Sequence, residues 1–173
     1  EDDPKRYLLA ESIPYGITMV QATVASQPGT PSERAVCIVD SGYDLGHPDL
    51  PGTGVVSGTD DPGTGSWATD ENHHGTHVAG TIAALANNSQ GVIGVMPNSN
   101  LDLHIIKVFG ADGWAYSSTL VAAVQACETA GADVVSMSLG GSFKSRSEDA
   151  AFRDFDRAGM LSIAAAGNDG NTR

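Results

Sequence analysis

The feature that most limits the fold is an uninterrupted apolar run at residues 35–39, Ala-Val-Cys-Ile-Val. The run has no polar alternation and is rich in β-branched side chains, which is typical of a strand buried on both faces of a sheet. Helices and strands are expected to alternate after it: helices at 74–86, 117–130 and 147–157, and strands at 101–109, 132–138 and 160–166. This alternation predicts an α/β fold, a three-layer, doubly wound, mostly parallel sheet with helices on both faces.

The remaining segments are expected to be less regular. Residues 1–33 contain four prolines and two short helical pieces, at 6–10 and 16–22. Residues 51–69 hold five glycines and two prolines, which predicts a long loop. The length of 173 residues is enough for about one domain with a substantial core.

Charge and hydropathy argue against several classes of partner. Lys plus Arg number 9 and Asp plus Glu number 21, so the net charge is −12, which argues against nucleic acid or an anionic membrane. No apolar run approaches the roughly 20 residues of a membrane span. The polar start at residues 1–6 is not a signal peptide and is typical of a processed end. These features are compatible with a secreted protein.

Two cysteines, Cys37 and Cys127, both lie in apolar surroundings. They are either inert buried thiols or partners in a disulfide, which would close a long loop and stabilise the fold by a few kcal/mol.

Two histidines, His74 and His77, stand three residues apart at the opening of a helix rich in small residues. This spacing places them on the same face of the helix. Glycine inside a helix costs about 1 kcal/mol relative to alanine, so Gly75 and Gly80 suggest a close approach of other backbone. Asn72 is the expected N-cap.

Three interpretations of these histidines compete. They are hydrogen-bonded residues of a core helix, or metal ligands together with His73, or they include a general base. The metal interpretation lacks the usual i, i+4 spacing with an intervening glutamate. The general-base interpretation needs a carboxylate to orient His74 and a nucleophile for it to serve.

Polar groups follow three of the predicted strands: Asp40, Ser138 and Asn168. The carboxyl ends of parallel strands meet at one edge of the sheet, where open α/β sheets place their active sites. Asp40 would hold one nitrogen of the His74 ring and leave the other to take a proton. The Asn168 amide would donate to a developing oxyanion.

Four motifs, VDSGYD (39–44), HGTHVAGT (74–81), MSLGG (137–141) and AAAGN (164–168), together resemble the subtilisin-like serine peptidases. The resemblance covers residues 11–170, and the motifs occur in the order and at the approximate spacing of that family. It implies that Asp40 is the orienting carboxylate, His74 the general base, Asn168 the oxyanion donor and His77 a structural residue. It also implies peptide-binding residues at Gly113, Trp114, Ala115, Ser138, Leu139, Gly140, Ala165 and Gly167.

The resemblance further implies a Ca²⁺ site. The segment that begins at Glu11 matches the N-terminal segment of the family, and the loop at 85–92 matches its calcium loop. The implied ligands are Glu11, Asp49, Leu85, Asn88, Gln90 and Val92, with side-chain oxygens from the first, second and fourth and carbonyls from the others. Six or more oxygen ligands, some of them charged, suit this hard cation.

One part of the family pattern is missing. The nucleophile of the family lies in a Gly-Thr-Ser-Met-Ala-like motif, which this sequence lacks, and Ser41, Ser136 and Ser138 match positions that are not nucleophilic. Residues 1–173 therefore resemble the N-terminal portion of one peptidase domain, whose sheet a C-terminal segment would complete.

This pattern leads us to expect a secreted, zymogen-derived serine endopeptidase that hydrolyses peptide bonds in proteins. The catalytic serine would lie on a separate C-terminal fragment of a nicked enzyme, which makes that fragment and protein or peptide substrates the expected partners. One alternative is a non-catalytic fragment or pseudo-enzyme that binds peptides or its complementary fragment. Another is a metal-dependent hydrolase that uses the histidine cluster.

Overall fold

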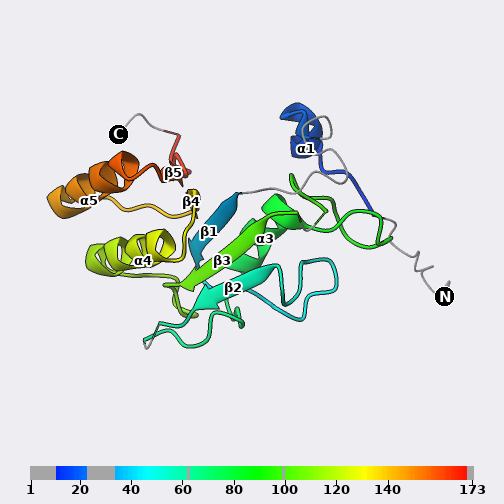
Figure 1. Ribbon diagram of the computed structural model, residues 1–173, viewed down its shortest axis with the longest axis horizontal. Helices are drawn as coiled ribbons and strands as arrows, with labels where there is room; N and C mark the ends of the chain where they lie inside the picture. Colours follow the sequence, from blue (N-terminus) through cyan, green and yellow to red (C-terminus); the bar gives the residue numbers. More distant parts are fainter. Residues whose placement is uncertain (1–10, 23–33, 62, 99, 171–173) are drawn as a thin grey trace, which may run out of the picture.

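A five-stranded, all-parallel sheet forms the centre of the computed structural model, which describes residues 11–22, 34–61, 63–98 and 100–170. The strand order is β2-β3-β1-β4-β5. The strands are β1 (Ala35–Asp40), β2 (Val56–Thr59), β3 (Asp102–Lys107), β4 (Val134–Met137) and β5 (Leu161–Ala164). The chain runs from the central β1 to one side of the sheet and then returns to the other side (Figure 1).

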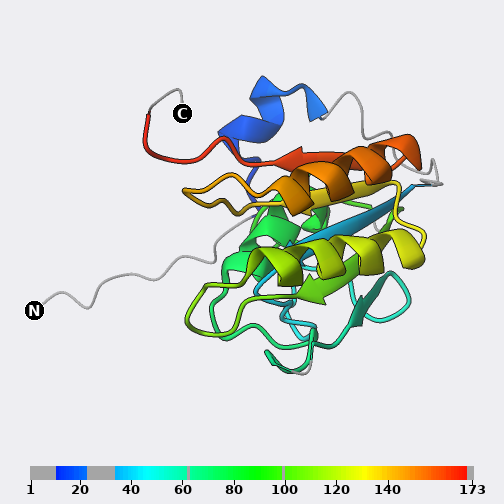
Figure 2. The same cartoon turned by 90° about the vertical axis from the view of Figure 1, so that its left-hand side faces the viewer.

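Helices cover both faces of this sheet (Figures 1 and 2). The helices are α1 (Tyr15–Met19), α3 (His74–Ala83), α4 (Ser117–Thr129) and α5 (Arg146–Arg157). Alternate residues of β1 face the two layers: Cys37 and Val39 pack with α4 and α5, and Ile38 packs with α3. The predicted three-layer α/β architecture is therefore confirmed.

The expectation of a long loop at 51–69 is wrong in part, because β2 lies inside it. Val56 is buried and pairs with Leu103, and Thr59 pairs with Ile106. The strand has only four residues and includes Gly58, so the surrounding glycines concealed it. The predicted helical piece at 16–22 corresponds to α1, and the piece at 6–10 lies outside the described residues.

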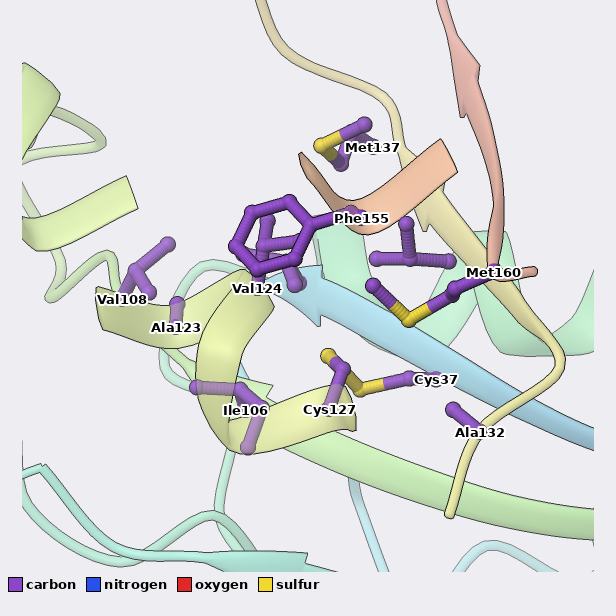
Figure 3. Packing of buried hydrophobic residues seen from close by; sticks show 12 residues of the cluster. Cys37, Ile106, Val108, Ala123, Val124, Cys127, Ala132, Met137, Phe155 and Met160 are labelled. Carbon is purple, nitrogen blue, oxygen red and sulfur yellow. A yellow bond between two sulfur atoms is a disulfide. The ribbon is translucent and has the colours of Figure 1, made fainter. Parts of the chain in front are cut away.

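Cys37 and Cys127 form a disulfide that joins β1 to α4 inside the hydrophobic core (Figure 3). Their Cα atoms lie 5.7 Å apart, and both residues are fully buried. The structure thus decides between the two alternatives that the sequence left open for these cysteines.

Candidate active site

The centre of the site is a contact between Asp40, the last residue of β1, and His74, the first residue of α3. Asp40 Oδ1 lies 2.7 Å from His74 Nδ1. The Asp40 side chain is fully buried, whereas that of His74 is 50% exposed. A carboxylate at Nδ1 favours the tautomer with its proton there and leaves Nε2 free to accept one. No other hydrogen bond of the imidazole occurs in the described part of the chain.

A glycine lets α3 begin directly against the end of β1. A Cβ atom at Gly75 would lie 2.3 Å from the carbonyl oxygen of Gly42 and 3.2 Å from Asp40 Cβ, so this position admits no side chain without displacement. At Gly80 the nearest atom to such a Cβ is Leu50 Cδ2 at 3.9 Å, an ordinary contact. The steric need expected at Gly75 is confirmed, and the one expected at Gly80 is wrong.

The carboxylate of Asp70, rather than Asn72, caps α3. The backbone N–H groups of Asn72, His73 and Thr76 donate to it, the last at 2.8 Å. The predicted cap at Asn72 is wrong because His73, with φ of 68°, occupies the cap position and the chain turns there through the left-handed region. Burial raises the pKa of Asp70, but hydrogen bonds from Thr76, Ser41 and His73 outweigh it and hold the pKa below its usual value.

Ser41 connects this cap to the Asp40–His74 pair. Its Oγ donates to Asp70 Oδ1 at 2.8 Å and accepts from the N–H of Gly75 at 2.9 Å. Its own N–H donates to Asp40 Oδ1 at 2.8 Å. Ser41 is buried and its hydroxyl is fully engaged, so it positions the pair and is unsuited to act as a nucleophile.

A buried lysine holds the segment that leads into α3. Lys107, paired with Asp40 in the sheet, is fully buried at the end of β3. Its Nζ donates to the carbonyl of Thr69 at 3.0 Å and to the Glu71 carboxylate. The hydrogen bond from Lys107 is the main cause that lowers the pKa of Glu71. These contacts fasten the segment before α3 to the sheet.

The histidines do not form a metal centre. Within the described residues no group of three His, Cys, Asp or Glu side chains is placed to share a metal ion. His74 instead contacts Asp40, and His77 is exposed. The metal interpretation of His73, His74 and His77 is therefore wrong.

A cleft of about 600 Å³ opens beside the Asp40–His74 pair. One wall comes from the segment that leads from β3 into α4, and the other from the segment that leads from β4 into α5. Six of the eight predicted peptide-binding residues line it: Gly113, Trp114, Ala115, Ser138, Leu139 and Gly140. Trp114 and Tyr116 pack edge to face at its rim, with ring centroids 5.2 Å apart.

The two remaining peptide-binding residues, Ala165 and Gly167, follow β5 along the chain together with the predicted oxyanion donor Asn168. Ala165, Gly167 and Asn168 are exposed and do not belong to the lining of the cleft. The Ala165 N–H donates to the carbonyl of Met137, so this segment continues beside the end of β4. Ala165 thus lies at the carboxyl edge of the sheet, three residues before Asn168, and the role of Asn168 toward a substrate stays a prediction.

The predicted calcium ligands also gather in space, around the carboxylate of Asp49. The Asn88 side chain donates to Asp49 Oδ1 at 2.7 Å, and the Val92 N–H donates to Oδ2 at 2.9 Å. Glu11 accepts from the Asn88 N–H at 3.0 Å, and the Leu85 N–H donates to the Asp49 carbonyl. A Cβ at Gly91 would lie 2.1 Å from Asp49 Oδ2, so the loop closes tightly over this buried carboxylate.

Two residues of the site escaped the sequence interpretation. Asp70 caps α3 from outside the expected helix, four residues before it, and Glu148 of α5 lines the cleft. For Glu148 the sequence offered only the Ser-x-x-Glu pattern at 145–148. That pattern indicates the start of a helix rather than a functional site.

None of the helices in the described residues is long and apolar enough to cross a bilayer.

Comparison with known proteins adds independent findings. The model of the subtilase family matches residues 32–173. The alkaline protease of Alkalihalobacillus alcalophilus is 41% identical over 171 residues, which are 98% of this chain and 43% of that protein. Subtilisin DY of Bacillus licheniformis is 38% identical over 164 residues, 94% of this chain and 58% of that protein.

A solved structure agrees with these matches. The psychrophilic subtilisin-like protease Apa1 of the Antarctic psychrotroph Pseudoalteromonas sp. AS-11 superimposes with a TM-score of 0.85 at 52% identity, over 93% of this chain and 37% of that one. The chain thus spans about two fifths to three fifths of the length of these relatives.

Proposed function

The chain belongs to the subtilase family, and on this basis we propose that it supplies the acid–base pair and the oxyanion donor of a serine endopeptidase. The nucleophilic serine would come from a C-terminal segment outside this sequence. The observation that carries the proposal is the 2.7 Å contact between Asp40 and His74 at the mouth of a cleft.

The reaction would proceed by acyl transfer. A peptide would lie as an added strand between 113–115 and 138–140. The serine oxygen attacks the scissile carbonyl carbon, and its proton passes to His74 Nε2. The carbonyl oxygen becomes an oxyanion, to which the Asn168 amide would donate, and Asp40 stabilises the imidazolium. His74 then returns the proton to the leaving amine, and water hydrolyses the acyl-enzyme by the same steps.

Labelling with a serine-reactive organophosphonate tests this proposal directly. We expect one label per complete protein, on a serine outside residues 1–173, and no label after His74→Ala. A label on Ser41 or on another serine of this chain, or no label at all, would contradict the proposal. Intact mass in the same experiment shows whether the labelled serine is on a separate fragment, as the sequence predicts, or on a longer continuous chain.

We also propose that Glu11, Asp49 and Asn88, with the carbonyls of Leu85, Gln90 and Val92, hold Ca²⁺. The carboxylates of Glu11 and Asp49 meet Asn88 of the 85–92 loop, and no lysine or arginine pairs with Asp49 among the described residues. Oxygen donors of this kind suit a hard cation. The ion would fasten the segment before α1 and the 85–92 loop to Asp49, so its contribution is structural.

Calcium is therefore expected to raise the midpoint of thermal unfolding. A ligand at 100 times its Kd stabilises by about 2.7 kcal/mol. Calorimetry in excess Ca²⁺ and in excess chelator measures the difference between the two midpoints. Asp49→Asn should abolish this difference, whereas Asp102→Asn, at the exposed start of β3, should preserve it. A difference that survives Asp49→Asn would place the ion elsewhere.

The proposed location is extracellular. The Cys37–Cys127 disulfide supports it, because structural disulfides form and persist mainly in oxidising compartments.

A further inference from the structure

The part of the cleft lining that comes from α4 (Ser117–Thr129) and α5 (Arg146–Arg157) combines a carboxylate with apolar and aromatic side chains. The first turns of α4 and α5 form it, with Leu120 from α4 and Glu148 and Phe152 from α5. Glu148 and Phe152 stand four residues apart, so they lie on the same side of α5. Phe109 and Phe143 also line the cleft. Such a surface offers packing for a long aliphatic stem and a negative charge for the group at its end.

Glu148 is available for a ligand. Asp40 and Glu148 are the two acidic residues among those that line the cleft. The Asp40 carboxylate is buried against His74, which leaves that of Glu148. The Glu148 N–H donates to Ser145 Oγ, but its carboxylate makes no hydrogen bond or ion pair within the described residues. The reciprocal bond of a capping box, from the Ser145 N–H to this carboxylate, is not formed. The Glu148 carboxylate therefore lines the cleft and makes no hydrogen bond or ion pair with the described part of the chain.

From these observations we propose that Glu148 makes the cleft selective for peptides that carry a lysine or arginine at one position away from the scissile bond. The inference rests on the proposed function and adds the substrate class to it. The aliphatic stem of the basic residue would pack on Leu120 and Phe152, and its cationic group would pair with Glu148. Aromatic faces near the same point would add a cation–π attraction.

Neighbouring Asp149 offers a matched control. It lies in the same first turn of α5 and carries the same charge, but its carboxylate accepts from Arg153 at 2.7 Å and is not part of the cleft lining. Asp149→Asn thus removes the same charge from the helix N-terminus and from the acidic surface. A difference between the Glu148 and Asp149 variants isolates the contact with the peptide.

The test uses the complete protein and end-labelled peptides in which one lysine, or its neutral isostere norleucine, is moved through every position. We expect one position at which lysine raises kcat/KM about 5-fold over norleucine, the size of a partly exposed ion pair. Glu148→Gln should remove this ratio, Glu148→Lys should replace it with a preference for glutamate, and Asp149→Asn should keep it. Hydrolysis without a lysine preference, or a preference that survives Glu148→Gln, overturns the inference and leaves the proposed function standing.

Binding measured without turnover separates the two hypotheses. In the His74→Ala background, the anisotropy of the same peptides should show the same lysine preference in Kd, again dependent on Glu148. If peptides bind in this way but the protein with His74 intact hydrolyses none, the inference holds and the proposed function is overturned. If no peptide is bound or hydrolysed, both are overturned.

Discussion

Asp40→Asn is expected to lower kcat of the complete enzyme by about 10⁴-fold with little change in KM. The Ser41 N–H and His74 Nδ1 both contact Oδ1 of this carboxylate, and Oδ2 is buried with no hydrogen-bond partner among the described residues. If the asparagine oxygen takes the place of Oδ1, its amide becomes a buried donor without an acceptor. If the amide takes that place, it disfavours the tautomer with a proton on Nδ1. In both orientations the negative charge that stabilises the imidazolium is lost.

Steady-state kinetics on a peptide substrate measure this effect. Asp44→Asn is the matched control, because Asp44 lies four residues further on and its carboxylate accepts only from the Gly46 N–H in the described structure. The control variant should retain activity within a few-fold. The downfield proton resonance of His74 Nδ1 should be present in the control and absent in Asp40→Asn. An Asp40→Asn enzyme with a tenth of the normal kcat would show that Asp40 does not orient His74.

Loss of the disulfide should give the largest change in stability. The bridge joins residues 90 positions apart, and the chain-entropy model predicts about 4–5 kcal/mol for a loop of roughly that length. The double variant Cys37→Ala/Cys127→Ala should therefore unfold at a much lower denaturant concentration. Alanine is the suitable replacement, because both sulfurs are buried in an apolar core and a serine hydroxyl would lack a partner there.

Denaturant titration of both proteins, with and without reductant, measures the contribution. Reductant should destabilise the wild-type protein to about the level of the double variant and should leave the variant unchanged. A loss of less than about 1 kcal/mol in the free energy of unfolding would mean that the bridge adds little to the packing around it.

The sequence predicted the contact between Asp40 and His74 because local signals marked each partner, and their catalytic roles followed from the family resemblance. The apolar run at 35–39 was typical of a buried strand, which placed Asp40 at its carboxyl end. His74 opened a helix of small residues, and the steric need at Gly75 followed from its cost in a helix. Parallel pairing then brought the end of β1 and the start of α3 to the same edge of the sheet.

Other features depended on contacts that local patterns do not encode. β2 is held by its pairing with β3 and has little strand character of its own. The Asp70 cap depends on a left-handed turn at His73, which disfavours most side chains. Cys37 and Cys127 were compatible with a bridge, but only the packing of α4 on β1 brings them together. In the sequence, Glu148 had only the pattern of a helix-start residue, and its position in the cleft depends on how α5 packs in the fold.

The burial of Lys107 has a consequence for chemical footprinting. The full sequence contains three lysines, Lys5, Lys107 and Lys144. The Lys144 side chain is 80% exposed, whereas that of Lys107 is fully buried beneath the segment before α3. An acylating reagent will modify Lys144 at once and Lys107 only when that corner of the sheet opens. The ratio of the two adducts, measured by mass spectrometry, therefore reports how fast the corner around Asp40 and His74 opens, with Lys144 as the internal reference.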